Sequence, residues 1–120
     1  MSAPCKEDIL KAAERIRPYL HRTPVLTSEV LNEISGAQLF FKCENFQKAG
    51  AFKSRGATNA VFSLGPDELK KGVATHSSGN HAAALARAAR LKQIPAYIVM
   101  PENSSKVKIE AVKHYGGNIT

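Results

Sequence analysis

The sequence has few of the features that mark secreted, membrane-spanning or disulfide-stabilised proteins. Its two cysteines, Cys5 and Cys43, are too few and too far apart for a disulfide framework. The N-terminus, MSAPCKEDILKAAERIRPYL, carries charges of both signs and lacks the apolar core of a secretory signal. No apolar run approaches the roughly 20 residues that span a bilayer. We therefore predict a cytoplasmic protein with no membrane attachment.

Several motifs for cofactor or metal binding are also missing. There is no G-x-G-x-x-G element, and no Walker loop, because no glycine directly precedes a lysine followed by Ser or Thr. The S-x-x-K pattern at residues 105–108 lacks the companion motifs of serine acylases, so coincidence explains it better. Neither cysteine has a metal-ligand spacing, and zinc-type spacing is absent from the four histidines, His21, His76, His81 and His114.

The basic charge of the chain does not gather into one patch. The formal net charge is +7 and the pI is near 9.7, which raises nucleic acid as a partner. However, the 17 basic residues are spread along the chain, often beside acids. The densest cluster, KVKIEAVKH, places its lysines around an amphipathic helix. We predict solvated helix faces rather than a nucleic-acid site.

What the sequence does contain is an alternation of strand and helix patterns in its second half. Helical spacing predicts earlier helices at residues 6–20, from Ser28 to Gly36, and after residue 53, with a strand at residues 38–44 and a break at GPDEL. Strands are then predicted at residues 72–77, 94–101 and 118–120, with helices at residues 78–91 and from Ser104 or Ser105 to Gly116. The continuous apolar strand IPAYIVMP is typical of a strand covered on both faces. The pattern predicts a parallel, doubly wound α/β sheet that stops as a strand begins, so we expect a fragment or a truncated product.

The segment THSSGNHAAA is the first candidate for a binding site. It turns from a predicted strand into a predicted helix, where ligands of open α/β sheets bind. Free backbone N–H groups and the helix dipole favour a carboxylate or phosphate there. Taken alone, the loop is explained equally well as a helix cap rich in Ser and Asn.

The second candidate is Lys53, in KAGAFKSRGATNA, which follows the apolar pair Ala51 and Phe52. Together, FKSRGA (residues 52–57) and SSGNHA (residues 77–82) resemble the serine racemase branch of the fold-type II pyridoxal-phosphate enzymes, the serine/threonine dehydratase family. Supporting stretches are HRTPVLTS, LFFKCENFQKAGAFK, IPAYIVMP and YGG, and the match runs from about residue 10 to the last residue. The resemblance implies an α/β fold of the tryptophan synthase β type, incomplete in this chain. It also implies that residues 1–70 begin the large domain and residues 71–120 begin the small domain.

The resemblance assigns roles to individual residues. Lys53 matches the lysine that forms the internal aldimine with pyridoxal phosphate, which requires a neutral amine, and an apolar surround favours the neutral form. Phe52 matches the residue whose ring packs beside the cofactor, and Asn80 the residue that hydrogen-bonds its phenolic oxygen. The substrate carboxylate is expected at a loop that contains Ser77, Ser78, Asn80 and His81.

Ser78 is the position that separates racemases from dehydratases. Threonine dehydratases of this fold usually carry alanine there, whereas racemases carry serine as an acid–base group on the cofactor face opposite the lysine. Racemisation needs groups on both faces of Cα, and Lys53 and Ser78 match that pair. The resemblance therefore implies an isomerase and lyase that interconverts L- and D-serine and eliminates serine to pyruvate and ammonia. A threonine/serine dehydratase and a truncated non-catalytic paralogue are the alternatives; Ser78 counts against the first, and the early stop supports the second.

Some expected family features differ or fall outside the chain. Ala51 stands where serine is more common, and AAA follows His81 where Gly-Gln is common, which affects substrate preference more than mechanism. A nucleotide effector site is implied near Ser28 and Lys48, although the neighbouring acid Glu29 counts against ATP. The glycine-rich phosphate cup, the group that faces the pyridine nitrogen and the ligands of a divalent cation (Mg or Ca) are expected beyond residue 120. The full-length family member is expected to be a homodimer.

Overall fold

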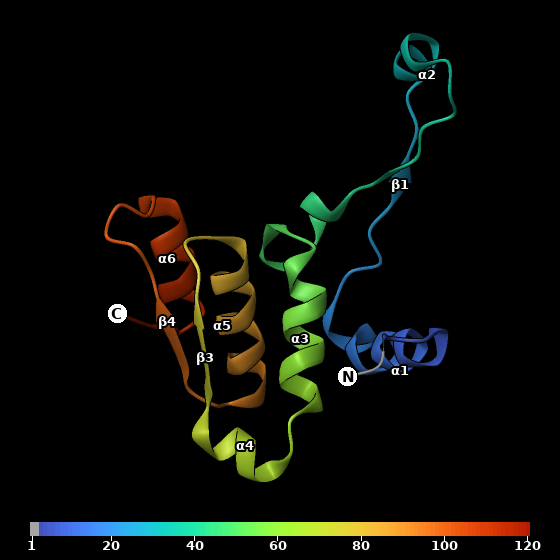
Figure 1. The fold of residues 1–120 in the computed structure, drawn as a ribbon. Helices are drawn as coiled ribbons and strands as arrows, with labels where there is room; N and C mark the ends of the chain where they lie inside the picture. The colour runs from blue at the N-terminus through green and yellow to red at the C-terminus, as the bar shows by residue number, and fades with distance from the viewer. Residues whose placement is uncertain (1–2) are drawn as a thin grey trace.

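The chain folds into a body of helices and one small parallel sheet, from which a thin arm projects (Figure 1). The computed structural model describes residues 3–120. Its radius of gyration is 16.7 Å, against about 14 Å for a compact domain of this length, and the arm accounts for the difference. The helices and strands are α1 (Lys6–Ile16), β1 (Val25–Leu26), α2 (Glu29–Ser35), β2 (Phe41–Lys42), α3 (Lys53–Ser63), α4 (Pro66–Lys71), β3 (Val73–His76), α5 (Asn80–Lys92), β4 (Ala96–Val99), α6 (Lys106–His114) and β5 (Asn118–Ile119).

The first helix and the arm follow the sequence signals closely. Helix α1 starts at Lys6 as expected but ends at Ile16, and a 3-10 turn, Arg17–Tyr19, follows around Pro18, because proline has no N–H to continue the helix. Two short 3-10 turns, η2 (Glu44–Phe46) and η3 (Lys48–Gly50), lead into α3.

In the arm, β1 and β2 pair antiparallel, and α2 lies at the tip. The Ser28 hydroxyl accepts the Leu31 N–H at 3.4 Å, and Gly36 ends α2 with φ of 65°, so the predicted caps of this helix are confirmed. The strand expected at residues 38–44 is only two residues long. The apolar side of α2 is exposed.

The second half of the chain confirms the predicted parallel sheet. Strand β4 pairs parallel with β3 on one side and with β5 on the other. Helix α5 connects β3 to β4, and α6 connects β4 to β5. Ser105 precedes α6 as its N-cap residue, but its side chain makes no capping hydrogen bond.

The sheet is not doubly wound, and β4 is not covered on both faces, so these two predictions are wrong for the described residues. Ala96 and Ile98 of β4 are buried, whereas Tyr97 and Val99 are 50% and 55% exposed. The spatial order of the strands follows their order in the chain. Two right-handed crossovers in the same direction place both helices on one face of the sheet, and the opposite face stays open.

The segment GPDEL forms helix α4 rather than the break that we expected. Pro66 occupies the first helical position, where a missing N–H costs nothing. The Gly65 N–H donates to the Glu68 carboxylate at 2.8 Å. Acidic residues in the first turn and Lys70 and Lys71 in the last turn match the helix dipole. Gly72 then ends α4 with φ of 76°.

The core forms where α5 packs against α3 on one side and the sheet on the other. All six alanines of α5 are buried, and these small side chains let the neighbouring elements approach closely. Val61 of α3, Ile98 of β4 and Val112 of α6 complete the centre of the core. The proposed domain segments 1–70 and 71–120 therefore touch through α3 and α5, and the boundary between them stays a prediction. Within residues 3–120, none of the helices has the length and apolar character needed to span a bilayer.

Candidate active site

Lys53 is the first residue of α3, and a tight turn delivers the chain to it. Ala49 and Gly50 both adopt left-handed backbone conformations, with φ of 54° and 65°. This conformation is uncommon for alanine and easy for glycine. The Gly50 N–H donates to the Gln47 carbonyl at 2.8 Å, which closes the turn. The turn therefore directs the chain from η3 into the start of α3.

The Phe52 ring lies beside the Lys53 amine. The Lys53 Nζ lies 5.1 Å from the centre of the ring, within the range of a cation–π contact. However, Lys53 is exposed and Phe52 is 58% exposed. The apolar surround that we expected around the amine is therefore not formed by the described residues, because solvent reaches both side chains.

The two residues after Lys53 anchor the start of α3 to the preceding loop. Ser54 is fully buried, and its hydroxyl donates to the Lys48 carbonyl. Arg55 donates two hydrogen bonds to Glu44, from Nε to Oε2 at 2.8 Å and from Nη2 to Oε1 at 2.6 Å. Bidentate pairs of this kind are among the stronger polar contacts in proteins. The start of α3 is thus fixed by side chains that sequence reasoning did not single out.

Glu44 is also held from the other side by residues 21–24. The Thr23 hydroxyl donates to Glu44 Oε1 at 2.5 Å, and Thr23 is buried. Hydrogen bonds from Arg55, supported by the one from Thr23, lower the pKa of Glu44 to about 2, although its partial burial acts in the opposite direction. The same ion pair raises the pKa of Arg55. Glu44 is therefore ionised throughout the neutral range.

Gln47 ties the same loop to residue 21. Its side-chain carbonyl accepts the N–H groups of His21 and Lys48, both at 2.9 Å, and its amide donates to the His21 carbonyl at 2.8 Å. Gln47 is 4% exposed, so these bonds replace water that the buried amide cannot reach. In the sequence, the only signal for these anchors was that Thr23, Glu44, Gln47 and Arg55 lie within the stretches that carry the family resemblance.

The loop with Ser77, Ser78, Asn80 and His81 lies where the sequence predicted, between the end of β3 and the start of α5. The Ser77 N–H donates to the Val99 carbonyl at 3.0 Å, which extends the β3–β4 pairing by one residue. The Gly79 N–H donates to the Ser77 hydroxyl at 3.3 Å. Gly79 is the residue before α5, and no side chain caps this helix. The simple helix-cap interpretation therefore loses its support, and the first N–H groups of α5 are left for another acceptor.

Lys53 and this loop lie at the same end of the structure. Helices α3 and α5 pack along each other, and Figure 1 shows both helices starting at the end where β3 finishes. An open groove of about 470 Å³ is lined by His76, Ser77, Ser78, Val99, Met100 and Pro101. Lys53 does not line this groove. The structure thus brings the two motifs to one end of the molecule without enclosing them in one cavity.

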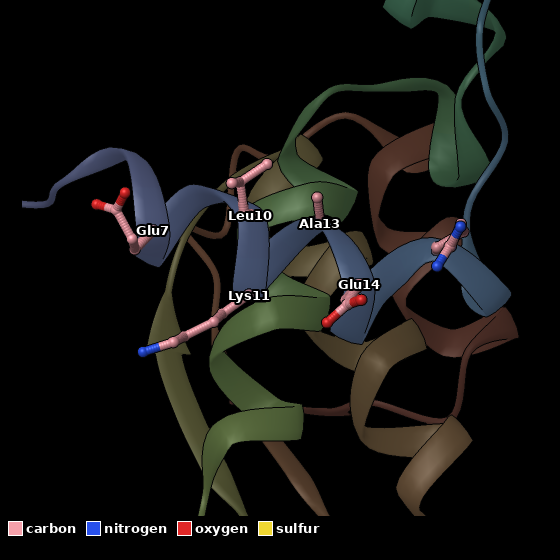
Figure 2. Close-up of a pocket in the computed structure, with 6 residues that line it drawn as sticks. Glu7, Leu10, Lys11, Ala13 and Glu14 are labelled. Atoms are coloured by element: carbon pink, nitrogen blue, oxygen red, sulfur yellow. The ribbon is translucent and has the colours of Figure 1, made fainter.

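Three further features of residues 3–120 do not form a site: the groove along α1, the proposed effector residues and the metal-binding types of side chain. A groove of about 580 Å³ is lined only by residues 7–17 of α1 and the turn after it (Figure 2), so it is one face of a helix and joins no catalytic groups. Ser28 lies in the projecting arm, whereas Lys48 lies in η3 beside α5, so the structure does not bring the two proposed effector residues together. In residues 3–120, no three His, Cys, Asp or Glu side chains gather closely enough to hold a metal ion.

Comparison with known proteins places the chain in a family. Residues 16–120 match the family model described as pyridoxal-phosphate dependent enzyme. The chain is 59% identical over 120 residues to beta-hydroxyaspartate dehydratase of Paracoccus denitrificans, covering 100% of this chain and 38% of that protein. It is 62% identical over 111 residues to serine racemase of Arabidopsis thaliana, covering 92% of this chain and 34% of that protein.

A solved structure agrees with these relatives. The structure of maize serine racemase is 55% identical and superposes with a TM-score of 0.95, covering 99% of this chain and 36% of the maize chain. The chain thus spans about a third of the length of the relatives that it matches. The parallel sheet, the Lys53 turn and the uncapped start of α5 together with these matches show that the chain belongs to the pyridoxal-phosphate dependent enzymes and has the α/β fold of their fold-type II branch.

Proposed function

We propose that the whole protein is a pyridoxal-phosphate dependent serine racemase that also eliminates serine to pyruvate and ammonia. The observation that carries this proposal is the pairing of Lys53 at the start of α3 with a serine-containing loop at the uncapped start of α5, at one end of the molecule. The matches to serine racemase of Arabidopsis thaliana and to the structure of maize serine racemase support it.

The chain's own residues fit the cofactor. The Lys53 amine is exposed and lies beside the Phe52 ring, so it is free to hold the aldehyde carbon of pyridoxal phosphate while the ring shields one side. Asn80, exposed at the start of α5, would hydrogen-bond the phenolic oxygen of the cofactor. When bound, pyridoxal phosphate supplies an electron sink that makes the α-proton of an amino acid removable.

The start of α5 is suited to hold the substrate carboxylate. Its first N–H groups have no side-chain cap, and the positive end of the helix dipole favours an anion there. Ser77 and His81 flank this position, and both are half-buried. A carboxylate bound at these N–H groups would fix the substrate so that its Cα lies between the two catalytic residues.

Lys53 and Ser78 are the groups that we propose to move protons. The Lys53 amine would accept the α-proton from one side of the substrate. The exposed Ser78 hydroxyl donates a proton from the other side, which inverts the configuration at Cα. Elimination needs proton removal and departure of the hydroxyl group, both of which Lys53 can assist from one side.

A second candidate is a dehydratase that acts on 3-hydroxyaspartate. The 59% identity to the Paracoccus denitrificans beta-hydroxyaspartate dehydratase covers every residue of this chain. Ser78 favours the racemase, but it does not exclude elimination. A homodimer, a nucleotide effector at Ser28 and Lys48, a divalent cation and a cytoplasmic location are further proposals for the whole protein.

One experiment separates the two candidates. The whole protein is supplied with L-serine, D-serine and 3-hydroxyaspartate in turn, and interconversion of the serine enantiomers is measured by chiral chromatography alongside 2-oxoacid release. A racemase converts each serine enantiomer into the other with similar efficiency. Strong 2-oxoacid release from 3-hydroxyaspartate without interconversion of serine would move the dehydratase ahead.

A further inference from the structure

Helix α3 begins without a side-chain cap, although its first residue is Lys53. Phe52, the residue before the helix, has no side-chain group that could cap it. Backbone carbonyls accept instead, that of Ala51 from the Ser54 N–H at 3.2 Å and that of Phe52 from the Arg55 N–H at 2.9 Å. Lys53 therefore stands on a first turn that only backbone bonds close, without the stabilisation that a side-chain cap adds.

The side chain of Arg55 ties this first turn to the preceding loop. Arg55 forms the bidentate pair with Glu44 at 2.8 and 2.6 Å. The Thr23 hydroxyl holds the same carboxylate at 2.5 Å, and the Lys42 amine donates to the Thr23 carbonyl at 2.6 Å. The side chain of Glu44 is 17% exposed and that of Arg55 is 38% exposed, so solvent only partly competes with this network.

The geometry of a helix explains why this network controls Lys53. Residues two positions apart in an α-helix are separated by about 200° around the helix axis. Arg55 therefore extends from the side of α3 roughly opposite to Lys53. A bond that holds Arg55 fixes the rotation of the first turn, and with it the direction in which Lys53 leaves the helix.

We propose that Thr23, Glu44 and Arg55, which we call the Glu44 clamp, are positioning residues that set the direction of the Lys53 amine. The proposal rests on the proposed role of Lys53 as the residue that holds pyridoxal phosphate. The clamp connects residues 21–24, the η2 turn and α3, which are distant in the chain.

Two variants separate positioning from charge. Glu44→Gln removes the anion and leaves the charge of Arg55 uncompensated, whereas Thr23→Val leaves both charges in place and removes only the hydrogen bond to Glu44. A purely electrostatic influence on the amine would appear in Glu44→Gln and not in Thr23→Val. A positioning role predicts that both variants act in the same direction, with the larger effect in Glu44→Gln.

The first readout is the attachment of pyridoxal phosphate to Lys53. The whole protein is incubated with excess pyridoxal phosphate and reduced with borohydride. Peptides that carry the reduced cofactor are then quantified by mass spectrometry. The exposed Lys71 serves as an internal reference for general amine reactivity. We expect Glu44→Gln to lower attachment at Lys53 on the order of tenfold relative to Lys71, since small displacements of a reacting group have effects of this size.

Matched controls identify an effect of general destabilisation. Val112→Ala opens the core in α6, far along the chain from Lys53, and urea concentrations are chosen so that its unfolded fraction equals that of Glu44→Gln. Asp67→Asn removes the exposed pair with Lys70, at 2.9 Å. Neither control is expected to change attachment at Lys53. The proposal is overturned if Val112→Ala lowers attachment as much as Glu44→Gln.

A second readout does not involve the cofactor. Amide hydrogen exchange at residues 54–57 is expected to accelerate on the order of tenfold in Glu44→Gln and not in Val112→Ala, and Arg55→Lys should give an intermediate rate because it keeps the charge but loses the bidentate geometry. If the parent protein attached no cofactor at Lys53, the proposed function would fail while this readout still tested the clamp. Unchanged exchange in Glu44→Gln would overturn the clamp even if Lys53 attached the cofactor normally.

Discussion

Lowering the pH should destabilise the folded protein by protonating Glu44. The substitution Glu44→Gln should remove this contribution to the pH dependence. Hydrogen bonds from Arg55 lower the pKa of Glu44 from its ordinary 4.5 to about 2. Because the pKa is lower in the folded state, the ionised carboxylate stabilises the protein above pH 4.5. This contribution is lost as the pH falls from 4.5 through about 2.

The size of the effect follows from the pKa difference and the exposure of the pair. At about 1.36 kcal/mol per pKa unit, the upper bound is about 3.4 kcal/mol. Arg55 is 38% exposed, so solvent screens the pair, and we expect about 1–2 kcal/mol at neutral pH. Glu7 and Asp8 also have lowered pKa values, but both are present in each protein compared and cancel in the difference.

The assay is urea unfolding followed by circular dichroism between pH 7 and pH 2.5, for the parent chain and for Glu44→Gln. The difference in unfolding free energy should be about 1–2 kcal/mol above pH 5 and should shrink steadily below pH 4.5. The exposed-pair variant Asp67→Asn should differ from the parent by less than about 0.5 kcal/mol at pH 7. A Glu44→Gln difference that stayed constant, or grew, as the pH fell would refute the reasoning.

Three further predictions concern catalysis and folding. In the whole protein, Lys53→Ala should abolish serine turnover and the visible absorbance of bound cofactor; cofactor trapped by borohydride on Lys48 in the parent would contradict the assignment. Ser78→Ala should lower racemisation about 10²–10⁴-fold in both directions while elimination from L-serine stays measurable, and racemisation near the parent rate would leave Ser78 without a catalytic role. Gly72→Ala should lower the unfolding free energy by about 3 kcal/mol, because its φ is 76° and a Cβ there would lie 2.6 Å from the Pro95 carbonyl oxygen. Gly36→Ala is the matched control, since its φ is 65° with nothing within 4 Å, and it should cost only about 1 kcal/mol; equal losses for the two glycines would show that the contact with Pro95 does not matter.

The sequence alone determined the parts of this protein that depend on local signals. The Ser28 cap and the Gly36 end of α2 were predicted correctly, because capping needs only residues within a few positions. The parallel pairing of β3, β4 and β5 followed from the alternation of strand and helix. The loop at residues 77–81 was placed correctly for the same reason. Helix α4 was missed because Gly and Pro were interpreted as a break, although Pro at the first helical position and Glu68 at the third favour a helix start.

Only the tertiary structure decided which faces are covered and how Lys53 is held. The open face of the sheet depends on the direction of two crossovers, which the apolar pattern of β4 does not encode. The exposure of Lys53 and Phe52 depends on what packs over them, and that cannot be read from neighbouring residues. The Glu44 clamp joins residues that lie 11 and 21 positions apart. Such pairs form because the folded chain brings their donors and acceptors together, so they appear only once the three-dimensional arrangement is known.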